Sequence, residues 1–116
     1  MVYWPIIAAA AAASSVQPGS RTDQDLHCLA AFSLVADSAK DEDKSSVMTV
    51  AMFYVGRLDA EAPELDLESA LAKVLSAPDY RDSSLKADIA RCSAEMQSKS
   101  TELQKVGKAL SNRGNN

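Results

Sequence analysis

The chain has 116 residues, of which 47% are apolar and 5% aromatic, and it carries a formal net charge of −4. This length fits one domain with one modest core. Alanine and leucine supply much of the apolar content, which favours helices over a β-sandwich. The acidic balance gives no broad basic field, so we predict no nucleic-acid partner and no attraction to anionic membrane surfaces.

The first 20 residues are typical of a secretory leader. An apolar run from Val2 to Val16 is short for a transmembrane helix, which needs about 20 apolar residues. Small residues suited to cleavage lie near Ala13, although no Lys or Arg precedes the run. The alternative is an alanine-rich N-terminus on a cytosolic protein.

This leader predicts an exported bacterial protein, either periplasmic or secreted. We divide the chain into a leader over 1–20, a single helical domain over 21–111 and a disordered tail over 112–116. With the leader removed, we expect no stable membrane span.

Cys28 and Cys92 are the two cysteines of the chain and allow one pairing. In an exported protein a disulfide is the default. Its loop of 64 residues would make it worth about 4 kcal/mol in the chain-entropy model. For a cytosolic chain, two buried free thiols are the alternative.

The first two segments of the domain are rich in apolar residues. The first starts near Thr22 or Asp23 and is apolar nearly all round, which predicts a central, well-covered helix that ends in a polar loop over 37–44. The second covers 45–60 and is capped by Ser45 or its neighbour. Its β-branched and aromatic residues would also suit a buried strand, but its length and its methionine and alanine content favour a helix.

A third, shorter segment covers 66–76, with Asp66 as a plausible N-cap and one apolar stripe. Pro78 ends it, because proline cannot continue a helix. A charged linker is predicted over 79–82.

The fourth segment is amphipathic and runs from about residue 82 to about residue 111. Its apolar side chains recur at spacings of three and four, which predicts a helix of more than 25 residues: they are Leu85, Ile89, Cys92, Met96, Leu103, Val106 and Leu110. We therefore predict an all-α domain of four helices, in which the Cys28–Cys92 disulfide fixes the first helix against this long C-terminal helix.

Two apolar clusters are candidates for a protein-binding surface. One lies in the second segment, where methionine adapts to varied partners, although burial in the core is the alternative that we favour. The other lies in the last segment and needs cover from the domain or from a second copy, which makes a homodimer a hypothesis. The candidate residues are Met48, Met52 and Phe53 in the first cluster, next to Tyr54, and Leu103, Val106 and Leu110 in the second.

The sequence predicts no catalytic, cofactor or metal site. His27 lies next to Cys28, but adjacent helical residues point about 100° apart, so the two side chains would not face each other. One histidine and two distant cysteines do not make a zinc set. The acidic run 41–43 lacks the spacing and the turn glycine of a calcium loop. Gly56 and Gly107 are isolated, so we predict no glycine-rich loop that could bind a phosphate. We therefore predict that the protein is not an enzyme and needs no cofactor.

The layout resembles that of the HdeA-type periplasmic acid-stress chaperones. The stretches that carry this resemblance are Cys28 to Phe32, and Ala87 to Cys92 before a charged amphipathic helix. The resemblance implies a small exported all-α protein that unfolds or dissociates in acid and then binds unfolding clients. The chain differs from that family because no tryptophan precedes Cys28, its cysteines are further apart and its middle helices have no obvious counterpart.

Together these features predict a protein that acts by binding another protein. Our first hypothesis is a chaperone or stress-related binding protein. The first alternative is a specific inhibitor or immunity protein for one partner, and the second is a family outside both classes.

Overall fold

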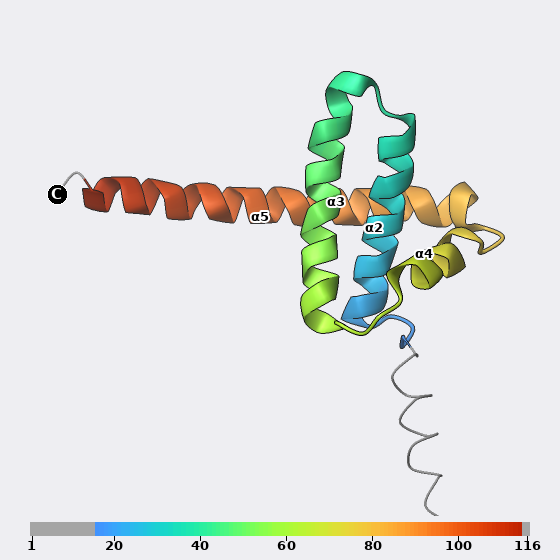
Figure 1. Cartoon of the computed structure of the whole chain (residues 1–116). Helices are drawn as coiled ribbons and strands as arrows, with labels where there is room; N and C mark the ends of the chain where they lie inside the picture. Colours follow the sequence, from blue (N-terminus) through green and yellow to red (C-terminus); the bar gives the residue numbers. More distant parts are fainter. Residues whose placement is uncertain (1–15, 115–116) are drawn as a thin grey trace, which may run out of the picture.

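The computed structural model describes residues 16–114 and contains no strand within that range. Four α-helices and one π-helical turn follow one another along the chain (Figure 1), which confirms the all-α prediction. They are α2 (Arg21–Ser38), α3 (Asp41–Glu61), α4 (Leu67–Leu75), η1 (Tyr80–Ser84) and α5 (Leu85–Gly114). Most of the predicted leader and the last two residues lie outside the described range.

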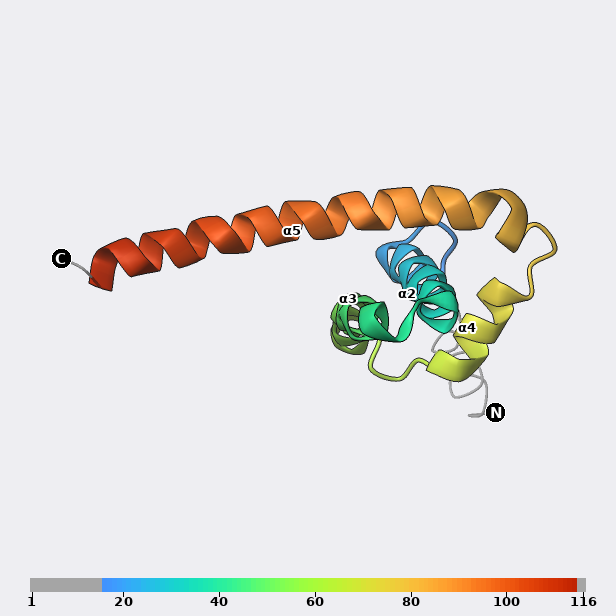
Figure 2. The same cartoon turned by 90° about the horizontal axis from the view of Figure 1, so that it is seen from above.

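The helices form a body of four helices with one long projection. α2 and α3 run antiparallel, side by side, and α5 crosses both of them on one side at a steep angle (Figure 1). α4 lies next to α2. Seen from above, the second half of α5 extends away from the other helices (Figure 2).

α2 is the central helix, as predicted from its nearly continuous apolar sequence. Cys28, Ala30 and Ala31 have no exposed surface. These small side chains let the neighbouring helices approach closely, and close packing is what a small core has to rely on. The buried cluster consists of Leu26, Cys28, Leu29 and Phe32 of α2, Ala51, Tyr54 and Leu58 of α3, and Cys92 of α5.

The N-terminus of α2 is capped earlier than predicted. Ser20, rather than Thr22 or Asp23, is the N-cap, and its hydroxyl accepts a hydrogen bond from the backbone N–H of Asp23 at 3.1 Å. The Asp23 carboxylate in turn accepts from the backbone N–H of Gly19 at 2.9 Å. The first bond satisfies one of the donors that a helix start leaves unpaired, and the second ties Gly19, before the cap, to the first turn.

The polar loop predicted over 37–44 is wrong. α2 continues to Ser38 and α3 begins at Asp41, so two residues separate the helices. The acidic residues 41–43 form the first turn of α3. Negative charge is stabilising there, because the helix dipole places a partial positive charge at its N-terminus.

The second half of the chain shows one confirmed cap and two corrections. Asp66 caps α4 as predicted, accepting from the backbone N–H of Ser69. The charged linker predicted over 79–82 is instead mostly part of η1, because Tyr80 is 2% exposed and holds this turn against α2. α5 continues to Gly114, so most of the segment 112–116, which was predicted to be disordered, is helical.

The predicted disulfide is confirmed. Cys28 and Cys92 are bonded, with their Cα atoms 5.7 Å apart, and the bond joins α2 to the first half of α5. α3 and α4 lie in the loop of 64 residues that it closes.

We expect the double substitution Cys28→Ser with Cys92→Ser to lower the free energy of unfolding by about 4 kcal/mol, because the unfolded chain regains the freedom of a long closed loop. Urea unfolding followed by circular dichroism measures this change. The wild-type protein under reducing conditions is the matched control and is expected to behave like the variant. Equal midpoints for the oxidised and reduced wild-type protein would contradict the prediction.

Candidate functional site

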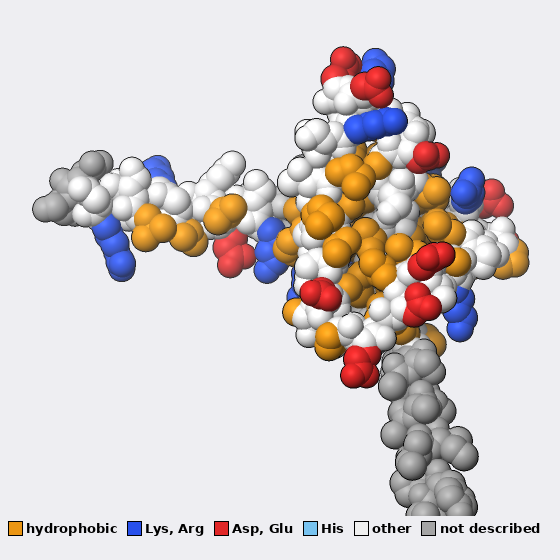
Figure 3. Space-filling model, viewed as in Figure 1, with side chains coloured by type: hydrophobic (Ala, Val, Ile, Leu, Met, Phe, Trp, Pro, Cys, Tyr) orange, Lys and Arg blue, Asp and Glu red, His pale blue; other side chains and the backbone are white. Residues whose placement is uncertain are grey.

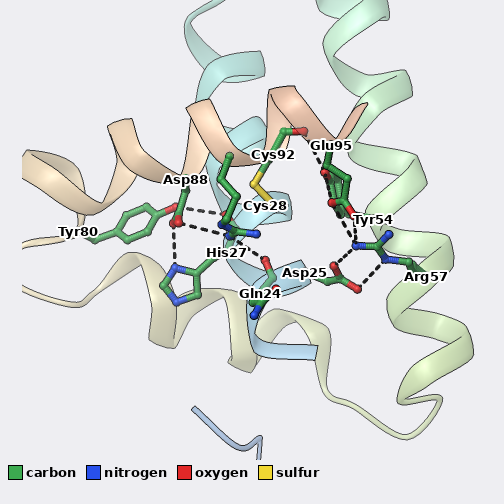
Figure 4. The surroundings of a disulfide bond; sticks show 11 residues. Gln24, Asp25, His27, Cys28, Tyr54, Arg57, Tyr80, Asp88, Cys92 and Glu95 are labelled. Atoms are coloured by element: carbon green, nitrogen blue, oxygen red, sulfur yellow. Dashed lines mark hydrogen bonds and ion pairs between the residues drawn. A yellow bond between two sulfur atoms is a disulfide. The ribbon is translucent and has the colours of Figure 1, made fainter. Parts of the chain in front are cut away.

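Arg57 of α3 joins three helices beside the disulfide (Figure 4). Its guanidinium donates to both carboxylate oxygens of Asp25 on α2, at 2.9 and 2.5 Å. It also lies 2.9 Å from Oε2 of Glu95 on α5. The Asp25 side chain is 1% exposed and that of Arg57 17%. Buried charges are costly unless they are paired, so the charges of α2 and α3 depend on each other.

Tyr54 completes this polar cluster from the core side. Its hydroxyl donates to Oε1 of Glu95 at 3.0 Å and lies 3.3 Å from the carbonyl oxygen of Cys92. The guanidinium of Arg57 lies 5.0 Å from the ring centre of Phe53 and 5.6 Å from that of Tyr54, within the range of a cation–π contact. Burial raises the pKa of Tyr54 far above its usual value, and Glu95 adds to this shift, so the hydroxyl stays a donor.

The pKa values of the two carboxyl groups near Arg57, those of Asp25 and Glu61, are shifted in opposite directions. Burial opposes the ionisation of Asp25, but hydrogen bonds with Arg57 and Glu61 outweigh it, and the pKa of Asp25 lies below its usual value. Burial and the neighbouring Asp25 raise the pKa of Glu61. Hydrogen bonding to Asp25 raises the pKa of Arg57, which therefore remains a cation.

A second polar cluster surrounds His27 at the other side of the disulfide (Figure 4). Nδ1 of His27 lies 2.9 Å from Oδ2 of Asp88 on α5. The ring of Tyr80 meets the His27 ring edge-on, and the Tyr80 hydroxyl donates to the His27 carbonyl at 3.3 Å. Because Cys28 is bonded to Cys92, His27 has no thiol beside it. These contacts hold the start of α5 against α2.

One shallow hollow lies where the start of α2 meets the segment after α3. Its volume is about 460 Å³. Its lining mixes apolar and polar side chains without a convergent set of donors: Val16, Gln17, Ser20, Thr22, Glu61, Ala62, Pro63, Glu64 and Leu65.

The described part of the chain has neither a cluster of metal ligands nor a helix suited to span a membrane. Between residues 16 and 114, no three His, Cys, Asp or Glu side chains lie in an arrangement that could hold a metal ion. Over the same range, no helix has both the length and the apolar character needed to cross a membrane.

The residues of the methionine cluster predicted from the sequence differ in their exposure to solvent. Met48 is 49% exposed and Met52 is 58% exposed, so the alternative of burial in the core is wrong for both. That alternative holds for Tyr54, which is fully buried. Phe53 is half-buried and lies against Arg57. Successive helical residues point about 100° apart, so Met52 and Phe53 cannot share one face.

Met48, Met52 and Val55 form one face of α3, since they are spaced by four and three residues. This face is turned away from α5, because Arg57 reaches α5 from the other side of the helix. We call these three residues the apolar face. In Figure 3, hydrophobic side chains of the neighbouring helices continue it over α2 and α4.

The second candidate surface lies on the part of α5 that projects from the body. All residues from Gln97 to Gly114 are exposed, and we call this part the tail. Leu103 is 71% exposed, Val106 49% and Leu110 59%. Of the two sources of cover predicted for these three residues, the body of the same chain does not provide it.

Sequence analysis missed the Asp25–Arg57 pair. A signal was present, because Asp25 lies four and seven residues before Leu29 and Phe32 and therefore shares their buried face. Its partner lies 32 residues away in the sequence and cannot be found from local spacing.

Comparison of the chain with models of protein families, with curated proteins and with solved structures finds no match. The resemblance to HdeA-type chaperones therefore stays a prediction from the sequence.

We expect Arg57→Met to lower the free energy of unfolding by about 3–5 kcal/mol, because it leaves the Asp25 carboxylate buried without a counter-charge. Denaturant unfolding at neutral pH measures this loss. Arg21→Met is the matched control, since Arg21 is 64% exposed and pairs with Glu61 at 3.7 Å, and we expect it to cost less than about 1 kcal/mol. Equal losses in the two variants would contradict the importance of the buried pair.

Acid should remove the stability that Asp25 contributes. Because the folded pKa of Asp25 is lowered, this contribution is complete above its unfolded pKa, about 3.9, and is lost as the pH falls through the folded pKa. The raised pKa of Glu61 acts in the opposite sense, since its ionisation costs stability as the pH rises through the folded value.

In Asp25→Asn, the free energy of unfolding should therefore fall less steeply below about pH 4 than in the wild-type protein. Denaturant unfolding at a series of pH values measures the slope. Glu61→Gln is the control with the opposite sign: it should make the slope steeper between about pH 4.5 and the raised folded pKa of Glu61, and leave the slope below pH 4 nearly unchanged. An unchanged slope in Asp25→Asn would show that this carboxylate does not govern the response to acid.

Proposed function

We propose that this protein acts by binding other proteins, as a chaperone or stress-related binding protein, and not as an enzyme. The observation that carries this proposal is the apolar face, where two methionines are half exposed on a body that is otherwise acidic. Exposed apolar surface of this kind marks an interaction site. Flexible, polarisable methionine side chains can pack against clients of different shapes.

The restraints on α3 support a response to acid. The disulfide ties α2 to α5, whereas α3 is tied to both by the ion pairs of Arg57 with Asp25 and Glu95. Protonation of Asp25, as the pH falls through its lowered folded pKa, removes the buried counter-charge of Arg57 and leaves the disulfide intact. Since α3 carries the apolar face, acid loosens the helix that presents the binding residues.

We further propose that the protein is exported and resides in the periplasm or outside a bacterial cell. The leader-like sequence over 1–20 and the disulfide both support this placement, because disulfides persist in oxidising compartments.

The test is whether the oxidised full chain keeps unrelated proteins from aggregating, followed by light scattering. We expect suppression at about pH 2.5, where most carboxyl groups are protonated, and none near neutral pH. Absence of suppression at both pH values would overturn the chaperone function.

Matched variants locate the binding surface. Met48→Ser with Met52→Ser should reduce the suppression several-fold, because it removes the exposed apolar groups without touching the core. Ser45→Ala with Thr49→Ala is the control on the same helix, at exposed positions that carry no apolar side chain. Full activity of the methionine variant would show that clients bind elsewhere.

A specific inhibitor or immunity protein is the second candidate function. It is favoured by the way the disulfide and Arg57 fix α2, α3 and α5 in one arrangement, as a rigid binding surface requires. This function predicts one tight partner at neutral pH and no protection of unrelated proteins, so the same assay separates the two.

A further inference from the structure

The tail of α5 carries an apolar stripe against which no other helix of the described chain packs. Around the helix axis, Leu103, Val106 and Leu110 lie within about 40° of the direction of Cys92, which points at α2. The stripe therefore continues the side of α5 that packs against the body. Hydrophobic side chains are visible along the projecting part of α5 in Figure 3, in the same view as the apolar face.

The tail and the body have opposite charge. Within the tail, the four cations Lys99, Lys105, Lys108 and Arg113 outnumber the single anion Glu102, which leaves a net charge of +3. Since the whole chain carries −4, the rest of it carries −7. Asp and Glu side chains lie around the edge of the hydrophobic area in Figure 3. A tail is therefore attracted to a body and repelled by another tail.

The length of the tail also matches the width of the surface that α2 and α3 form together. Its 18 exposed residues span about 27 Å at the rise of an α-helix. Packed helices lie about 8–10 Å apart, so a helix of this length crosses two neighbours such as α2 and α3. The tail cannot reach the apolar face of its own chain, because α5 runs as one helix away from the body.

We propose that the chain forms a two-fold dimer in which the tail of each copy docks on the apolar face of the other. Leu103, Val106 and Leu110 then cover Met48, Met52 and Val55, and the basic residues of the tail meet the acidic edge. Because the stripe and the face point to the same side, a half-turn brings both pairs together and closes the assembly.

This assembly goes beyond the proposed function but uses the same surface, so a client and the tail of a second copy compete for the apolar face. The experiments below contain no client. If the chain forms no dimer, the chaperone proposal is unaffected. If the aggregation assay shows no suppression, the dimer proposal is unaffected.

The first experiment is analytical ultracentrifugation of the oxidised full chain over a dilution series at low and high salt. Contacts between opposite charges weaken as salt screens them, so we expect a dimer whose dissociation constant rises with salt. A monomer at all concentrations would overturn the proposal. So would a dimer that becomes stronger with salt, since that behaviour belongs to contact between two like-charged tails.

Substitutions then identify the two surfaces. Leu103→Asp on the tail and Met52→Asp on the apolar face should each weaken association about 100-fold, because docking would bury an unpaired carboxylate. Both positions are exposed, so the fold of the monomer stays intact. Thr101→Asp adds the same charge on the opposite side of the tail and is the matched control, with association close to wild type.

Mixing the two variants decides between assemblies. A pair of one Leu103→Asp chain and one Met52→Asp chain retains one intact contact, so the mixture should associate more strongly than either variant alone. In an assembly of two tails, Met52→Asp would associate like the wild-type protein and mixing would rescue nothing. Either of those results would overturn the proposal.

Discussion

The disulfide between Cys28 and Cys92 fixes the point where α5 crosses α2, and the rest of the body is arranged around that crossing. The core depends on it because three of the eight buried residues of the central helix are alanines. Small side chains allow close approach but bury little apolar area each, so they contribute less to stability than leucine or phenylalanine would. A covalent link offsets this by limiting the freedom of the unfolded chain.

The charged cluster centred on Arg57 is a restraint of a different kind. It holds α3 to α2 and α5 by charge, whereas the disulfide holds α2 to α5 covalently. Protonation acts on the first restraint and reduction on the second. Protonation therefore weakens the polar attachment of α3, while the apolar packing of Ala51, Tyr54 and Leu58 and the disulfide remain.

The surfaces follow from the same arrangement. α5 is amphipathic over its whole length, but the body covers its apolar stripe over the first half alone. The remaining stripe and the two methionines of the apolar face are exposed, whereas Val55 is half-buried against the core, and the tail and the body have opposite charges. The proposed binding of a client and the proposed association with a second copy would both use this exposed apolar surface.

The sequence by itself determined the helices and the cross-link, because 3.6-residue periodicity and helix caps are local and two cysteines allow one pairing. It placed the first loop wrongly, since an acidic run has the composition of a loop and also stabilises the start of a helix. The Asp25–Arg57 pair and the exposure of Met48 and Met52 were decided by tertiary structure alone. Whether a side chain is buried depends on which helices pack against its face. A contact between residues 32 positions apart cannot be predicted from the periodicity of the sequence.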